Sequence, residues 1–157
     1  MHTSETELLA EVVTPLVRPR RTFREAARAA LVAGTATNAL LYLLLDRAGL
    51  FPDWVLLPGT LTPLGLVRVV VATDVGIGAG LLGFALLRRR LADPRWLFTR
   101  LALAVLALSC TQPPMVLQNA PVRMWVGLCV LHVGAALALL GALRDVTPAP
   151  ATAREGR

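Results

Sequence analysis

Four long apolar stretches follow one another along the chain, separated by short segments rich in arginine, proline or glycine. They predict helices over about residues 26–45, 64–87, 95–117 and 122–143. Each has at least the length of about 20 residues that a helix needs to cross a hydrocarbon core of about 30 Å. The predicted fold is therefore an all-α membrane protein, a four-transmembrane-helix bundle.

Local signals mark the ends of these stretches. Asp93 followed by Pro94 is typical of a helix start, and Pro113 with Pro114 predicts a kink or an early end in the third helix. Residues 1–25 are predicted to form an N-terminal tail, and residues 144–157 a disordered tail. The transmembrane domain would then span residues 26–143.

The arginines predict the orientation. Thirteen lie in the N-terminal segment, between the second and third helices or near the C-terminus, and only three lie on the other side, at Arg47, Arg68 and Arg123. Such a bias favours the cytoplasm for the arginine-rich side. With an even number of spans, both termini are predicted to be cytoplasmic, in a bacterial plasma membrane.

Composition excludes a soluble domain. Apolar residues make up 55% of the 157 residues and charged residues 17%, with a mean hydropathy of +0.62. The net charge of +6 does not indicate nucleic acid as a partner, because the arginines stand at the ends of apolar runs. The lipid bilayer is the partner that this pattern predicts.

Glycines form two candidate packing seams. A literal GxGxxG motif occurs in the second helix, but no strand precedes it, so a dinucleotide site is rejected. Small residues at helical spacing instead favour close helix packing. The packing could be within the bundle, between protomers of a homo-oligomer, or against another membrane subunit. These seams consist of Gly76, Gly80 and Gly83 on the second helix and Gly127, Gly134 and Gly141 on the fourth.

Polar residues in the spans define a candidate layer in the outer half of the bundle. Its members are Asn38, Asp74, Ser109, Gln112 and His132. Asp74 and His132 point roughly away from the glycine seams of their helices, so seams and polar groups are not both expected inside the bundle. The favoured interpretation is a hydrogen-bond network that fixes packing; the alternative is a shallow site for protons or for a cationic or polar ligand.

Other chemistry finds little support. Cys110, Cys129 and His132, with Asp74, are too few to favour a metal site, and a single intramembrane histidine does not favour haem. The sequence contains no recognisable catalytic set or phosphate loop. Neither a cofactor nor an enzymatic activity is therefore predicted.

A combination of short motifs resembles a known family. It consists of a basic N-terminus, Asn38 in the first helix, Ser109 followed by Pro113 and Pro114, and the stretch LHVGAA at residues 131–136. The chain resembles a family of small four-helix membrane proteins of unknown function from actinobacteria, over about residues 20–145. Two hypotheses remain, a non-enzymatic structural or accessory membrane subunit and a small transporter or ligand-binding membrane protein.

Overall fold

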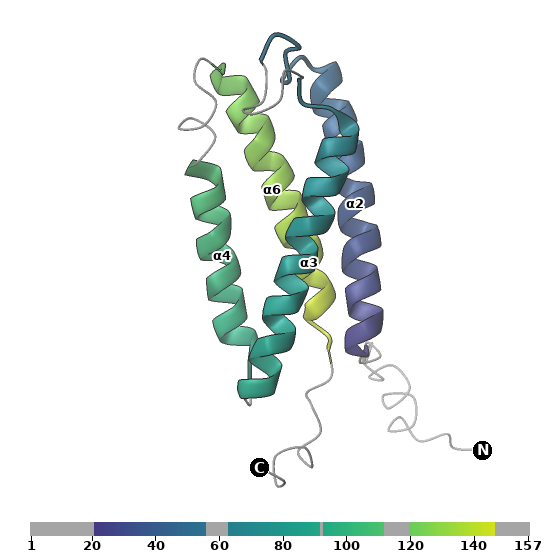
Figure 1. The fold of residues 1–157 in the computed structure, drawn as a ribbon, viewed down its shortest axis with the longest axis vertical. Helices are drawn as coiled ribbons and strands as arrows, with labels where there is room; N and C mark the ends of the chain where they lie inside the picture. The colour runs from purple at the N-terminus through teal and green to yellow at the C-terminus, as the bar shows by residue number, and fades with distance from the viewer. Residues whose placement is uncertain (1–20, 56–62, 92, 112–119, 147–157) are drawn as a thin grey trace, which may run out of the picture.

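The described part of the chain folds into four helices, in a computed structural model that describes residues 21–55, 63–91, 93–111 and 120–146. The helices are α2 (Phe23–Arg47), α3 (Leu66–Arg90), α4 (Arg95–Thr111) and α6 (Val122–Leu143). They run alternately up and down beside one another (Figure 1). This confirms the all-α architecture for the described residues, where the one isolated backbone bridge joins Arg21 and Val146.

Three of the helices are long and apolar enough to cross a membrane. These are α2, α3 and α6, with 25, 25 and 22 residues. The expected fourth span corresponds to α4, which has 17 residues and is not among the candidate spans found in the described residues. The predicted third helix extends to residue 117, whereas α4 ends at Thr111. Pro113 and Pro114 explain an early end, because neither has an N–H to donate to the carbonyl four residues earlier.

The first helix begins earlier than the apolar run does. Thr22 precedes α2, and its hydroxyl accepts from the Glu25 backbone N–H at 3.3 Å, while the Glu25 carboxylate accepts from the Thr22 N–H at 2.8 Å. This reciprocal pair is a capping box, which satisfies two backbone donors that a helix start leaves free. Capping therefore places the start at Phe23, within the basic segment that precedes the apolar run.

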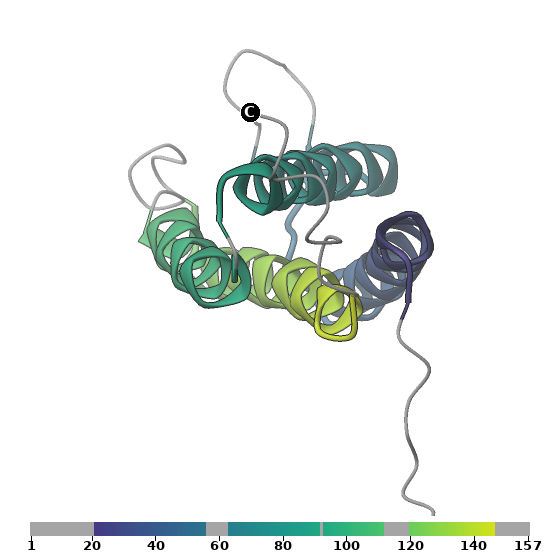
Figure 2. The same cartoon turned by 90° about the horizontal axis from the view of Figure 1, so that it is seen from below.

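The four helices do not pack equally. Figure 2 shows α4, α6 and α2 side by side in a curved row, with α3 on one side of this row. In the described part of the chain α6 contacts all three other helices, whereas α2 and α4 do not touch. The core is consequently built around α2, α3 and α6, and α4 is a peripheral helix.

Two apolar clusters fill the space between the helices. The first lies towards the start of α2 and the end of α3, and includes Ala30, Ile77, Phe84, Phe98 and Leu139. The second lies towards the other end of the bundle, and includes Tyr42, Phe51, Val69, Met124 and Leu131. Residues 35–38 of α2 and 73–74 of α3 fall between the two clusters in the sequence of each helix, so polar side chains there are bounded by apolar packing on both sides.

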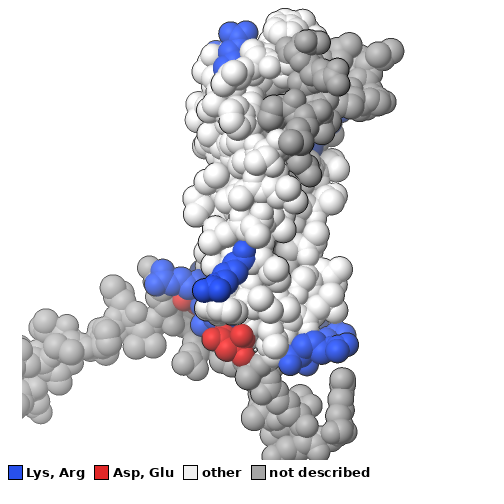
Figure 3. Space-filling model, turned by 90° about the vertical axis from the view of Figure 1, so that its left-hand side faces the viewer, with Lys and Arg blue, Asp and Glu red and all other residues white. Residues whose placement is uncertain are grey.

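Charge is concentrated at the ends of the bundle. The antiparallel order brings the start of α2, the end of α3, the start of α4 and the end of α6 to one end (Figure 1). We call it the arginine-rich end, defined by Arg21, Arg24, Arg28, Arg88, Arg89, Arg90, Arg95, Arg100 and Arg144. Figure 3 shows charged side chains gathered at that end of one face and uncharged surface over most of its length. The uncharged surface includes many exposed leucines and valines, which suits contact with lipid.

Candidate functional site

Two hydrogen bonds between polar side chains join α2 to α3. The Asn38 amide donates from Nδ2 to Oγ1 of Thr73 at 2.9 Å, and both side chains are buried. One turn away, the Thr35 hydroxyl donates to Oδ1 of Asp74, which is half-buried. Two of the predicted polar residues, Asn38 and Asp74, are thus placed side by side on neighbouring helices. Each is hydrogen-bonded to a threonine of the other helix.

Asn38 also packs directly against α6. The Asn38 Oδ1 atom is buried and has no hydrogen-bond partner among the described residues. A Cβ atom added at Gly134 would stand 2.6 Å from this oxygen and 3.0 Å from Cδ1 of Leu41. Only a residue without a side chain allows α6 to approach Asn38 so closely, since carbon atoms normally keep about 3.5–4.0 Å from their neighbours.

The remaining members of the predicted polar layer do not join this group. His132 is exposed, and its Nδ1 lies 2.7 Å from the Leu128 carbonyl of its own helix. Ser109 is half-buried on α4, a helix that makes no contact with α2 in the described residues. Gln112 lies outside the described residues. The polar group therefore comprises Asn38 and Asp74 with their threonine partners, and it is confined to α2 and α3.

The glycine seams divide between the interior and the surface. Gly80, Gly127 and Gly134 meet neighbouring side chains, because an added Cβ would stand within 3 Å of Leu139, Phe51 and Asn38 respectively. At four other glycines an added Cβ atom would meet nothing described within 4 Å. These are Gly78 of the GxGxxG motif and the seam glycines Gly76, Gly83 and Gly141. The α6 seam thus packs mainly within the bundle, whereas most of the α3 seam faces outward.

A second polar contact holds the end of α4 against α6. The indole Nε1 of Trp125 donates to the Cys110 carbonyl at 2.5 Å, and the Cys129 thiol lies 3.8 Å from the same oxygen. The residue four positions after Cys110 is Pro114, which has no N–H, so this carbonyl has no helical donor. Side chains of α6 supply the missing partners.

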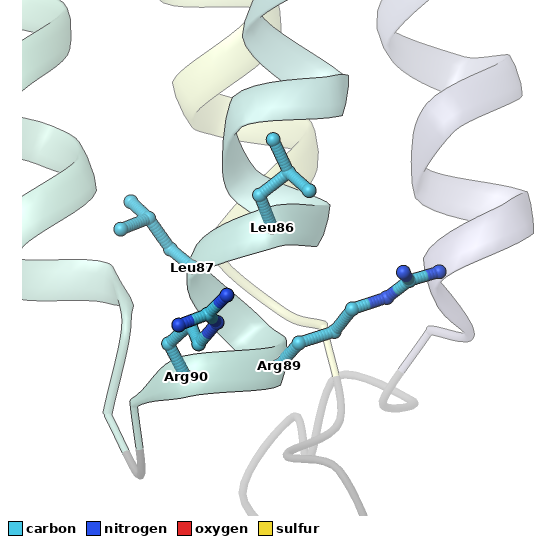
Figure 4. A pocket seen from close by; sticks show the side chains of 4 residues that line it. All are labelled: Leu86, Leu87, Arg89 and Arg90. Atoms are coloured by element: carbon cyan, nitrogen blue, oxygen red, sulfur yellow. The ribbon is translucent and has the colours of Figure 1, made fainter.

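One pocket in the described part of the chain lies away from both groups of contacts. It is lined by Leu86, Leu87, Arg89 and Arg90 at the arginine-rich end of α3. Figure 4 shows Arg89 extending towards α2 and Arg90 on the side of α3 nearer α4. None of the predicted polar residues lines it. Within the described residues, no three histidine, cysteine or acidic side chains gather in a way that would hold a metal ion.

A family of unknown function, DUF6069, matches residues 17–149 of the chain. The chain belongs to this family. No curated protein and no solved structure matches it. The DUF6069 match begins before α2 and ends after α6, so all four helices and both groups of polar contacts lie within it. The predicted resemblance to a family of unknown function is confirmed, over a range close to the expected residues 20–145.

In this DUF6069 chain, three contacting residues were missing from the predicted site. Thr35 and Thr73 supply the partners of Asp74 and Asn38, and Trp125 supplies the donor to α4. The spacing held a usable signal for Thr35, because Thr35 and Asn38 are three residues apart and share a helix face. Trp125 had a weaker signal: a tryptophan near a helix end is also typical of the headgroup region.

Proposed function

We propose that this protein is a non-enzymatic multi-pass subunit of a bacterial plasma membrane, of actinobacterial lineage, in which all four helices cross the bilayer. The observation that carries the proposal is the pairing of polar groups. Asn38 and Asp74 are each engaged by a threonine of the facing helix. Polar side chains used in this way attach helices to one another in lipid. They support a role in assembly more than one in chemistry.

The length of α4 is compatible with a fourth span. Its 17 residues extend about 26 Å at 1.5 Å per residue, which is at the short end of the range for transmembrane helices. Its charged residues, Arg95 and Arg100, stand in its first two turns, at the arginine-rich end. Because α4 lies beside α6, we infer that the two helices cross the membrane together.

The arginine-rich end is proposed to face the cytoplasm, with both termini on that side. Nine described arginines belong to that end, against Arg47, Arg68 and Arg123 at the other. An excess of arginine on one side of the membrane is the main determinant of orientation. The Asn38 and Asp74 contacts would then lie about 12–14 Å below the outer ends of their helices, counting eight or nine residues at about 1.5 Å each.

The outward face of α3 is the proposed association surface. Added Cβ atoms at Gly76 and Gly83 would meet nothing described within 4 Å, and the nearby Val75 and Leu82 are exposed. Glycines flanked by valine and leucine let a second helix approach closely and gain van der Waals contact. We propose that this face binds a second copy of the chain or another membrane subunit.

The test replaces the open glycines with leucine. We expect Gly76→Leu combined with Gly83→Leu to leave the packing of the chain itself largely undisturbed, because a Cβ atom at either position meets nothing described within 4 Å. We expect the wild-type protein to show an assembled mass in mild detergent by light scattering, and the double variant to show the monomer mass. Gly141→Leu is the matched control, an equally open glycine on α6, and should leave the assembly intact. A monomeric wild-type protein, or an assembly indifferent to the double variant, would contradict the proposal.

A second candidate is a small transporter or ligand-binding membrane protein. One observation favours it: Asn38 Oδ1 is a buried acceptor without a partner among the described residues, and the half-buried Asp74 carboxylate follows directly after Thr73, the residue to which Asn38 donates. Asp74→Asn keeps the side-chain shape and an acceptor for Thr35 while removing the titratable carboxyl. Lost uptake or binding of a cation by vesicles containing this variant would favour the second candidate. Unchanged stability and unchanged permeability would favour packing.

A further inference from the structure

The two cysteines of the chain are brought together at the end of α4. Cys110 and Cys129 are 19 positions apart in sequence and lie on different helices, α4 and α6. The Cys129 thiol lies 3.8 Å from the Cys110 carbonyl oxygen. Both cysteines are free thiols and both are half-buried.

The contact between Cys129 and Cys110 is accompanied by a second interaction at the same junction. Trp125 lies one turn from Cys129 on α6 and donates from its indole to the Cys110 carbonyl. Two side chains of α6 therefore converge on one residue of α4. This arrangement fixes the position of Cys110 relative to Cys129, because the carbonyl that they share belongs to the backbone.

We propose that Cys110 and Cys129 form a reversible intramolecular disulfide that ties the end of α4 to α6. The proposal rests on the orientation given under the proposed function, which places this junction in the outer half of the membrane, with Cys129 about 10 Å below the outer end of α6 at about 1.5 Å per residue. Disulfides form and persist outside the cytoplasm, where thiols are not kept reduced. Two cysteine residues held in contact there are a site for oxidation.

The reaction is thiol–disulfide exchange with a disulfide-bearing oxidant. One cysteine, as its thiolate, attacks a sulfur of the oxidant and forms a mixed disulfide, releasing the first oxidant thiol. The second cysteine then attacks the mixed disulfide, forming the Cys110–Cys129 bond and releasing the second oxidant thiol. The protein loses two electrons and two protons, and the oxidant gains them as two thiols.

A disulfide would change how α4, the peripheral helix, is attached to the bundle. The only buried residue of α4 is Phe98, which lies in its first turn, near the arginine-rich end. At the other end, the contacts of Cys110 with Trp125 and Cys129 hold α4 to the bundle. A disulfide would make this attachment covalent, and reduction would return it to hydrogen bonds. The redox state of the pair would thus determine how firmly α4 docks.

The test traps thiols in cells that express the full-length chain. Acid quenching followed by a polymer-linked maleimide should leave the wild-type protein mostly unlabelled, and prior reduction should allow two labels per chain. The intact mass of the unreduced protein should be about 2 Da lower, the mass of two hydrogens. Two labels without reduction would overturn the proposal, as would a disulfide-linked dimer on a non-reducing gel.

Three variants complete the test. Cys110→Ser and Cys129→Ser should each accept one label without reduction. In Cys110→Ser combined with Ser109→Cys, the thiol moves about 100° around α4, and it should remain free. Equal disulfide formation in this variant would overturn the proposal, since pairing would not depend on the observed contact. A reporter fused to each terminus tests the orientation separately, so a wrong orientation is distinguishable from an absent disulfide.

Discussion

A close approach between α2 and α6 at Gly134 leads to a sharp prediction for Gly134→Ala. The added methyl group would stand 2.6 Å from Asn38 Oδ1 and 3.0 Å from Leu41 Cδ1. Carbon needs about 3.5–4.0 Å, so the helices must separate by several tenths of an ångström or Asn38 must move. Asn38 is buried and hydrogen-bonded to Thr73, which makes its movement unfavourable. Overpacking of this kind costs about 1–3 kcal/mol.

Gly141→Ala is the matched control, because it makes the same change two turns further along α6. A Cβ at Gly141 meets nothing described within 4 Å. Alanine is favoured over glycine in a helix interior by about 1 kcal/mol in water, and both variants share this gain. The difference between their free energies of unfolding therefore isolates the steric cost, and Gly134→Ala should be the less stable variant by about 1–3 kcal/mol.

The measurement is equilibrium unfolding in mixed micelles, followed by loss of tertiary structure as the denaturing detergent is increased. A double-mutant cycle adds Asn38→Ala to Gly134→Ala. Removing the oxygen that the methyl group meets should recover part of the loss, with a coupling of about 0.5–3 kcal/mol. Equal stability of Gly134→Ala and Gly141→Ala would refute the close approach, and so would the absence of coupling in the cycle.

Three further predictions concern the polar contacts and the orientation. Thr35→Val removes the hydroxyl that donates to Asp74 and should lower the free energy of unfolding by about 1–3 kcal/mol in the same assay. Thr37→Val, at an exposed position two residues away, should have little effect. Trp125→Phe should cost about 1 kcal/mol by leaving the Cys110 carbonyl without its indole donor, and Trp54→Phe, at an exposed tryptophan, serves as its control. A phosphatase that is active only outside the cytoplasm should be inactive when fused to either terminus; activity at either one would contradict the proposed orientation.

Much of the architecture followed from the apolar pattern. Long apolar runs between arginine clusters predict helices because backbone groups in lipid must be paired within the helix. Three of the four predicted spans correspond to helices that can cross a membrane. The start of α2 was predicted three residues late, at 26. The hydropathy pattern gives no weight to the Thr22 and Glu25 cap, although the T-x-x-E spacing is present in the sequence.

The candidate site was predicted only in part, because helical periodicity does not show which face of a helix is buried. On α3 the buried residues are Val69, Thr73, Ile77, Leu81 and Phe84. At 100° per residue, this face lies between the direction of Gly76 and that of Asp74. The two directions were expected to be alternatives, one inside and one outside. In the structure the core lies between them, so Asp74 reaches Thr35 from one edge while Gly76 faces outward at the other.

The position of His132 does not follow from the angular position on α6 alone. The buried residues of this helix are Met124, Gly127, Leu131, Leu139 and Leu143, and the last two share the direction of His132 at 100° per residue. His132 is nevertheless exposed, and its Nδ1 lies 2.7 Å from the carbonyl of Leu128 on its own helix. An intramembrane histidine therefore need not belong to an interhelical network. Whether it does depends on which face the neighbouring helices cover, and that is determined by packing contacts between residues far apart in the sequence.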